Sequence, residues 1–308
     1  MQMLKWWVGA LALLALACGE VSEPSTPVVR DGEGLLELPL VSTSAGRSYK
    51  LVGATFAITG PQNATITDTS AESVSLALIA GTYSIQMNGD WHVERTDVPG
   101  VTVPVTLVSP NPMTFTLGEG ESRPVRFLFK VPEDGTADVG IGVDSGGWIS
   151  GTLQFEASPP PGSRPPSIFD GLNGKSIPFV ISYESATVAR SSGSYPKQVQ
   201  VQTAPVTFQL GGAVPEEVMQ QFVPALQGRS MEFSVSASGP GYSYAVHLFL
   251  ENLENGVRLE LHPRMIIGAD AEGYPLLVPT SMQAGDASLS NGSGYATASL
   301  HDGTFAPR

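Results

Sequence analysis

Leu78-Ile79-Ala80-Gly81-Thr82-Tyr83-Ser84-Ile85 predicts a strand, a tight corner and a second strand. Gly81 suits the corner, because a residue without Cβ adopts turn conformations that other residues avoid. Tyr83 and Ile85 stand two positions apart, so in an extended chain their side chains share one face. We expect that face to be buried and the surrounding chain to be β-structure.

The same stretch resembles the L-x-x-G-x-Y-x-V strand-turn-strand of prealbumin-like sandwiches, the group that contains carboxypeptidase regulatory-like and collagen-adhesin B-type domains. Phe115 to Phe129 give further support to the resemblance. It implies a prealbumin-like β-sandwich, and because one fold serves many functions it implies no particular activity.

Short strand-like runs continue on both sides of this corner. They cover residues 51–59, 74–78, 101–108, 113–117, 125–131, 139–143 and 148–155, with Gly, Pro and Asn between them. No long helical period interrupts them, which is typical of an antiparallel sandwich. We expect this first domain to cover residues 35–157.

A second β-rich domain is expected at residues 167–308, after the proline-rich linker 158–166. Asn255-Gly256 predicts a two-residue hairpin turn. Residues 215–223 predict one short helix, which Pro224 should end. The predicted fold class is therefore all-β: two tandem antiparallel β-sandwich-like domains after a signal peptide, with one short helix in the second domain.

The N-terminus has the pattern of a secretory signal. Lys5 precedes an apolar run that ends at Ala17, shorter than the roughly 20 residues a bilayer span needs. Leu14-Ala15-Leu16-Ala17-Cys18 resembles the lipobox of bacterial lipoproteins, which implies that the Cys18 thiol receives a diacylglyceryl group. An ordinary cleavage site after Ala15-Leu16-Ala17, with Cys18 left as a free thiol, stays open as the alternative.

The lipobox reading divides the N-terminal region into a signal peptide, residues 1–17, and an acylated cysteine with a disordered tether, residues 18–34. The tether has few large apolar residues, as expected of a solvated segment. In the lipoprotein family an aspartate after the cysteine favours inner-membrane retention. This chain has Gly19, so the resemblance implies a lipid anchor in the outer membrane.

Charge restricts the possible partners. The chain holds 16 basic and 29 acidic residues, a net charge of −13. Such a surface repels nucleic acid and anionic lipid headgroups. Cys18 is the only cysteine, which excludes an intramolecular disulfide and a cysteine-based zinc site. Besides the membrane, we expect an envelope protein or a glycan as partner, and no cofactor.

The strongest candidate for chemistry is the hairpin turned by Asn255-Gly256. With a two-residue loop, Glu251 would face Glu260 and Phe249 would face His262. This register places four potential metal ligands on one face: His247, Glu251, Glu260 and His262. Two imidazoles and two carboxylates could bind zinc or another divalent ion. Against a metal, the two histidines would be diagonal partners about 7–8 Å apart, so we favour an exposed polar face.

Three weaker motifs have simpler explanations. Asp144-Ser145-Gly146-Gly147 matches the core of the chymotrypsin-like nucleophile stretch, but upstream only His92 could serve as base, so a turn is expected. Glu133–Asp138 is expected to be a solvated turn rather than a calcium loop. Asp90, His92 and Glu94 should face solvent with Trp91 packed inward.

No catalytic residue is predicted. Aromatic residues that could contact a glycan, namely Trp148, Tyr242, Tyr244 and Tyr295, are assigned to packing instead. The favoured function is a non-enzymatic cell-envelope lipoprotein that presents β-sandwich modules for binding or structural support. Two alternatives stay open: a metal-dependent hydrolase that uses the hairpin cluster, and an accessory lipoprotein subunit of an envelope machine.

Overall fold

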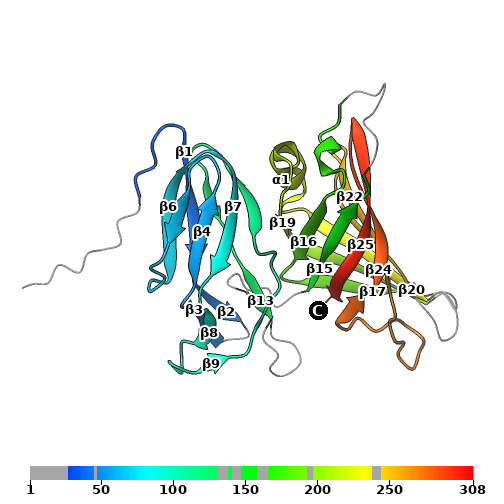
Figure 1. The fold of residues 1–308 in the computed structure, drawn as a ribbon. Coiled ribbons are helices and arrows are strands. Elements are labelled where there is room, and N and C mark those ends of the chain that lie inside the picture. The colour runs from blue at the N-terminus through cyan, green and yellow to red at the C-terminus, as the bar shows by residue number, and fades with distance from the viewer. Residues whose placement is uncertain are drawn as a thin grey trace, which may run out of the picture.

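The computed structural model describes residues 27–44, 47–130, 138–140, 147–157, 166–192, 197–237 and 244–307. These residues form sheets that are antiparallel except for the parallel pair of β1 with β12, and they contain very little helix, so the predicted all-β class is confirmed. Figure 1 shows two halves that lie side by side, with the helix α1 (Val223–Leu226) between them. Within the described residues, no helix has the length and apolarity to cross a membrane.

The first half is built like a sandwich around one core. One layer has the order β12-β1-β6, from β1 (Glu33–Pro39), β6 (Ser73–Ile79) and β12 (Ser122–Pro124). The other has the order β11-β7-β4-β5, from β4 (Thr55–Thr59), β5 (Ala64–Ile66), β7 (Gly81–Asn88) and β11 (Met113–Leu117). Their inward apolar side chains, among them Leu36 and Phe56, form a shared cluster.

Two smaller sheets extend this half. The first has the order β2-β3-β8-β9, from β2 (Val41–Ser44), β3 (Arg47–Val52), β8 (His92–Arg95) and β9 (Thr102–Val103). The second has the order β10-β13-β14, from β10 (Thr106–Leu107), β13 (Leu128–Lys130) and β14 (Asp138–Gly140). Leu51, Val93 and Phe129 from these sheets join the same core.

The corner at Gly81 carries the chain from one layer to the other, because β6 pairs with β1 while β7 pairs with β4 and β11. Gly81 has a φ of 152°, and a Cβ there would come within 2.6 Å of Pro61. Tyr83 and Ile85 are buried, as predicted. The Tyr83 hydroxyl donates a hydrogen bond to the carbonyl oxygen of Ile79 at 2.6 Å, which ties the two sides of the corner together.

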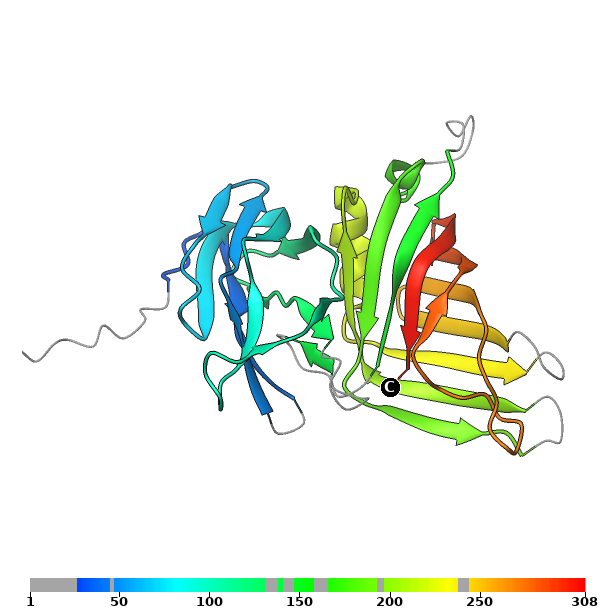
Figure 2. The same cartoon turned by 60° about the horizontal axis from the view of Figure 1, so that its bottom comes forward.

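The second half is one long antiparallel sheet that curls around its own core (Figure 2). Its strands are β15 (Trp148–Phe155), β16 (Ser176–Ser182), β17 (Ala186–Arg190), β18 (Gln198–Pro205), β19 (Thr207–Gly211), β20 (Ser230–Ala237), β21 (Tyr244–Asn252), β22 (Val257–Met265), β24 (Ala284–Asn291) and β25 (Gly294–Ala306), with β23 (Thr280–Met282) beside β25. The spatial order is β17-β18-β20-β21-β22-β24-β25-β15-β16-β19.

Helical structure covers one side of this core. A single 3₁₀ turn forms at Asp170–Leu172, and a π-helical turn, Val218–Phe222, leads directly into α1. The prediction that Pro224 ends the helix was wrong. Pro224 directly follows the π-helical turn at the second residue of α1, and the helix continues to Leu226. Phe222 and Leu226 are fully buried in the second core.

The division between the halves differs from the expected one. The first domain was expected to extend to residue 157, but β15 pairs with β16 and β25, and its Ile149, Leu153 and Phe155 belong to the second core. In the described residues the first core ends at Phe129. Strand alternation predicts that a segment is extended, yet it does not say which sheet the strand joins.

The halves are connected through one continuous fifteen-stranded sheet, because β11 of the first half pairs with β19 of the second. The connection is short: Met113 pairs with Gly211 and Thr114 with Leu210. Side chains reinforce it, since Gln209 accepts a hydrogen bond from the Ser109 hydroxyl at 2.8 Å and donates one to the Arg126 carbonyl at 2.8 Å.

Candidate functional site: a polar face on the second sheet

The second sheet has two chemically different faces. Along β18, Val199 and Val201 point into the core, whereas Gln198, Gln200 and Gln202 alternate with them and lie on the opposite face. The same alternation runs through β20, β21, β22, β24 and β25. We call the face that carries the glutamines the polar face.

Register places polar residues in rows that cross the strands. The row through Glu232 consists of directly paired residues: Thr187, Gln202, Glu232, Phe249, Glu260, Ser288 and Thr297. In the neighbouring row, Ala189, Gln200, Ser234 and His247 are paired in succession, and so are His262, Asp286 and Ser299. The polar face is therefore a band that runs across the strands rather than along one.

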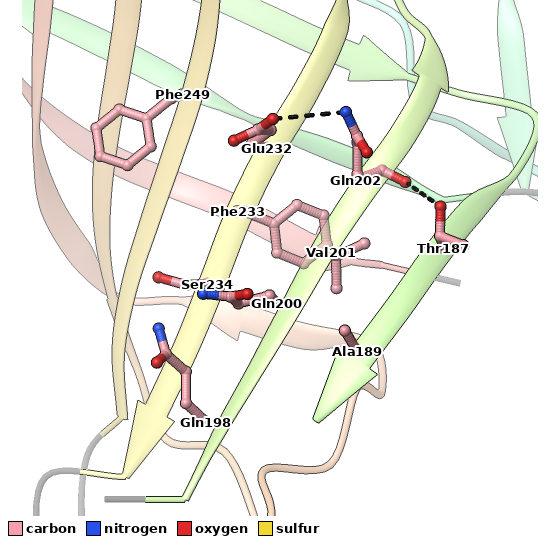
Figure 3. A pocket seen from close by; sticks show the side chains of 10 residues that line it. All are labelled: Thr187, Ala189, Gln198, Gln200, Val201, Gln202, Glu232, Phe233, Ser234 and Phe249. Atoms are coloured by element: carbon pink, nitrogen blue, oxygen red, sulfur yellow. Dashed lines mark hydrogen bonds between the residues drawn. The ribbon is translucent and has the colours of Figure 1, made fainter. Parts of the chain in front are cut away.

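A hollow of about 390 Å³ opens on the polar face over β17, β18, β20 and β21. Figure 3 shows the residues that line it: Thr187, Ala189, Gln198, Gln200, Val201, Gln202, Glu232, Phe233, Ser234 and Phe249. Val201 and Phe233 are core residues of these strands, and the others are mostly polar. We call this depression the glutamine hollow.

Hydrogen-bonding capacity in the glutamine hollow is only partly used. The Gln202 Nε2 donates to Glu232 Oε1 at 3.5 Å, and the Thr187 hydroxyl donates to the Gln202 carbonyl at 3.4 Å (Figure 3). Within the described residues, the side-chain amides of Gln198 and Gln200 make no hydrogen bond to the protein. Each of these amides therefore offers a donor and an acceptor to a ligand.

A second hollow, of about 420 Å³, lies further along the same rows. Its lining comes from β22, β24, β25 and the residue after β15: Glu156, Glu260, His262, Asp286, Ala287, Ser288, Thr297, Ala298 and Ser299. We call it the acidic hollow. Phe249 lines the glutamine hollow and His262 lines the acidic hollow, and His247 lies between the two hollows in the row order.

The hairpin between β21 and β22 corrects the predicted register. Its turn has four residues, Leu253–Gly256, so Glu251 faces Arg258 and Phe249 faces Glu260. Asn252 explains the longer turn. Its buried side chain donates to the Ala225 carbonyl at 2.9 Å and accepts from the Glu254 amide at 3.1 Å, which fixes the strand end against α1.

The register error was two residues, so the four candidate residues His247, Glu251, Glu260 and His262 still share the polar face. The histidines are direct neighbours rather than distant diagonal partners. Their ring centroids are 4.6 Å apart in an edge-to-face arrangement.

The carboxylates of this cluster are already paired. Glu260 Oε1 lies 2.9 Å from His262 Nε2, and Arg258 contacts Glu260 at 3.6 Å and Glu251 at 3.9 Å. Among the residues that the structure describes, no group of three or more His, Cys, Asp or Glu side chains could hold a metal ion.

The remaining motifs have separate outcomes. Trp91 packs against Phe129 with ring centroids 5.3 Å apart, as predicted, and His92 Nε2 lies 2.8 Å from Glu94 Oε1. This hydrogen bond lowers the pKa of Glu94. Cys18, the stretch Asp144 to Gly146 and residues 133–137 lie outside the described residues.

The aromatic residues considered as glycan contacts lie in different environments. Trp148 is buried, whereas the Tyr295 side chain is exposed. Tyr242 and the side chain of Tyr244 lie outside the described part. Two other aromatic residues line the glutamine hollow: Phe233, which belongs to the core, and Phe249, which lies on the polar face and which sequence analysis had placed only as a neighbour of the histidines.

Sequence analysis also missed the glutamines. Their signal was present as the alternation Gln198-Val199-Gln200-Val201-Gln202, which predicts a strand with one amide face. The hollow depends on β17, β20 and β21 beside it, and that arrangement is not local in sequence.

No family model matches the chain, no curated protein matches it, and no solved structure matches it.

Proposed function

We propose that the protein is a non-enzymatic lipoprotein of the cell envelope that binds an envelope partner through its second β-module. The observation that carries the proposal is the polar face, where two hollows lie along common rows of one sheet. Strands hold these side chains at fixed spacing, so the face is preorganised for a ligand.

The unengaged amides of Gln198 and Gln200 support binding over a purely structural role. Exposed glutamines on a sheet are ordinarily solvated, but here two adjacent ones open into the same concave surface as Glu232 and Phe249. A concave site with a few placed polar groups and an aromatic residue is the usual composition of a ligand site.

The membrane attachment is part of the same proposal. Cys18 carries the lipid, and the segment up to residue 32 links it to β1, which begins two residues before the expected end of the tether. Two or more acyl chains make anchoring stable, because each buried CH₂ contributes about 0.8 kcal/mol. The proposed location is the outer membrane, and the binding module is then displayed at a distance from the anchor.

The anchor is tested by intact-mass measurement of the protein purified from membranes, beside Cys18→Ala. We expect the wild type to begin at an acylated Cys18 and to sediment with membranes, and the variant to be released or unprocessed. An unmodified N-terminus in a protein that does not sediment with membranes would overturn the lipoprotein assignment.

The binding role is tested by co-sedimentation of purified protein with isolated envelope fragments. We expect the double variant Gln198→Ala, Gln200→Ala to lose most of the retention. Gln86→Ala is the matched control, since Gln86 is an exposed glutamine on a strand of the first half. Equal retention of the wild type and the double variant would show that the polar face is not the binding surface. A stoichiometric protein that co-purifies with the wild type would instead favour the accessory-subunit alternative.

A further inference from the structure

We propose that the polar face binds a neutral saccharide chain laid across the strands, from the glutamine hollow toward the acidic hollow. This inference rests on the proposed binding function and adds the chemical class of the ligand. It combines the hydrogen-bonding groups, the direction of the rows, the position of Phe249 and the charge of the face.

The hydrogen-bonding groups suit hydroxyl-rich ligands. A sugar hydroxyl is both donor and acceptor, and a glutamine amide offers both functions from one side chain. Gln198, Gln200 and Ser234 supply such groups, and Glu232 adds an acceptor. A ligand that must satisfy many hydroxyls in a confined space gains most from a lining of this kind, because each unpaired polar group costs free energy.

The direction of the rows suits a linear polymer. Neighbouring strands are about 4.8 Å apart, so successive side chains of one row follow each other at this spacing. This interval is comparable with the length of one pyranose unit. Residues Gln202, Glu232 and Glu260 in one row, with Phe249 between the last two, would therefore meet successive units of a chain that crosses the sheet.

Phe249 supplies an apolar surface within the polar row. It lines the glutamine hollow next to Glu232 and is half-buried. The Arg258 guanidinium lies over one face of the ring, 4.5 Å from the ring centroid, so a sugar would contact the opposite face. Aromatic faces carry partial negative charge and attract the C–H groups that a pyranose presents on one side.

Charge selects a neutral chain. The band carries more carboxylates than guanidinium groups, and both guanidiniums are engaged: Arg258 with Glu260 at 3.6 Å and Arg264 with Asp286 at 2.9 Å. An anionic polymer would meet this net negative charge without a free cation to pair with, so anionic saccharides and nucleic acid are disfavoured.

The test uses the full chain in detergent and titration calorimetry. The probes are neutral oligosaccharides of glucose, mannose, xylose and N-acetylglucosamine, each as a series of increasing length, with polygalacturonate as the anionic comparison. We expect one neutral series to bind with an affinity that rises with length, and polygalacturonate to bind more weakly.

The variants separate the contributions of the hollow. Gln198→Ala with Gln200→Ala, and Phe249→Ala, should each weaken binding by at least about tenfold, which corresponds to about 1.4 kcal/mol. Gln86→Ala should bind as the wild type does. Phe249→Leu keeps apolar bulk without the aromatic face, and it should retain the thermal stability of the wild type while losing affinity.

Two negative outcomes have different meanings. If no neutral series binds while envelope fragments still retain the protein through Gln198 and Gln200, the partner is a protein segment; the saccharide inference is then wrong and the proposed function stands. If neither saccharides nor envelope fragments bind, both proposals are wrong. Binding that Gln86→Ala weakens as much as the hollow variants would also overturn the site.

Discussion

Tyr83 is the residue on which the corner of the first half depends. Its ring is buried and stacks with Phe115 at a centroid separation of 5.5 Å, while its hydroxyl satisfies the Ile79 carbonyl four residues upstream. One side chain thus contributes to the core and also closes the backbone bend. Local arguments could predict this role, since Gly81, Tyr83 and Ile85 are close neighbours in sequence.

Replacing Tyr83 with Phe tests the hydroxyl alone. The ring contacts remain, but the Ile79 carbonyl loses its partner, so we expect the free energy of unfolding to fall by about 1–2 kcal/mol. Urea unfolding measures the change. Tyr49→Phe is the control, because Tyr49 is also buried and its hydroxyl makes no hydrogen bond to a described residue. An equal loss in both variants would contradict the role of the Ile79 bond.

Alkaline pH tests the same residue independently. Burial raises the pKa of the Tyr83 hydroxyl above its ordinary value of 10.0. The folded state therefore holds this proton more tightly than the unfolded state does. Stability is fully present below pH 10.0 and declines as pH rises through the folded pKa. We expect wild-type stability to decline relative to Tyr83→Phe across that range; parallel pH profiles would contradict this.

At the scale of elements, the segment between β22 and β23 crosses to the far strands of the sheet and is fastened there by Tyr274. The Tyr274 hydroxyl donates to the Ser191 carbonyl at 2.6 Å, and the cationic groups of Arg190 and Lys197 each lie 4.7 Å from its ring centroid. Asp270 shapes the segment by accepting the amides of Tyr274 and Glu272, both at 2.9 Å. We call residues 266–279 the Tyr274 loop.

Acid should loosen the Tyr274 loop. The hydrogen bond from the Tyr274 amide, assisted by those of Glu272 and Arg190, holds the pKa of Asp270 below its ordinary value. The carboxylate therefore stabilises the loop above the ordinary pKa of 3.8, and this contribution is lost as pH falls through the lowered pKa.

Amide hydrogen exchange at Tyr274 measures this change, with Asp270→Asn as comparison. We expect protection of the amide to decrease in acid in the wild type, after correction for the intrinsic exchange rate. In the variant, which does not titrate at this position, protection should be lower at neutral pH and should change less. The same acid response in both proteins would assign the effect to another group.

Element boundaries show where local sequence patterns stop being informative. Asn255-Gly256 favours a two-residue turn, but the buried Asn252 is bonded to Ala225 on α1, and this distant contact sets a four-residue turn. The face assignment of His247 and His262 survived because a shift by two residues preserves alternation. The contact between their two rings was not predicted, because it requires the observed register, in which the histidines are direct neighbours.

The two halves of the molecule meet through a narrow connection. Two residue pairs join β11 to β19, and the buried Gln209 adds polar contacts to Ser109 and the Arg126 backbone. The Thr114 and Thr116 hydroxyls also donate to the Gly212 and Met219 carbonyls, and the Gly212 amide donates to the Pro112 carbonyl. Sequence could not reveal the role of Gln209, because this residue is separated from Ser109 and Arg126 by 100 and 83 residues. The polar face could not be predicted from the sequence for the same reason, since its rows are formed by strands that are far apart in the chain.

Replacing Gln209 with Ala should weaken the coupling between the halves. Each core would keep its own packing, while the Arg126 carbonyl and the Ser109 hydroxyl would lose a partner, at a cost of about 1–3 kcal/mol. Calorimetry should show the wild type unfolding in one transition and Gln209→Ala in two. Gln86→Ala is the control and should behave as the wild type. A single unchanged transition in Gln209→Ala would contradict coupling through this residue.

The narrow β11–β19 connection also determines how the protein would respond to mechanical force. A lipid anchor at the N-terminus and a ligand on the second half would load the molecule across this connection when the envelope is sheared. Two ladder pairs and the few hydrogen bonds beside them would separate under less tension than a whole core, so the connection would yield first while both halves stay folded. The connection would then act as an extensible joint that lets the ligand site remain engaged under strain.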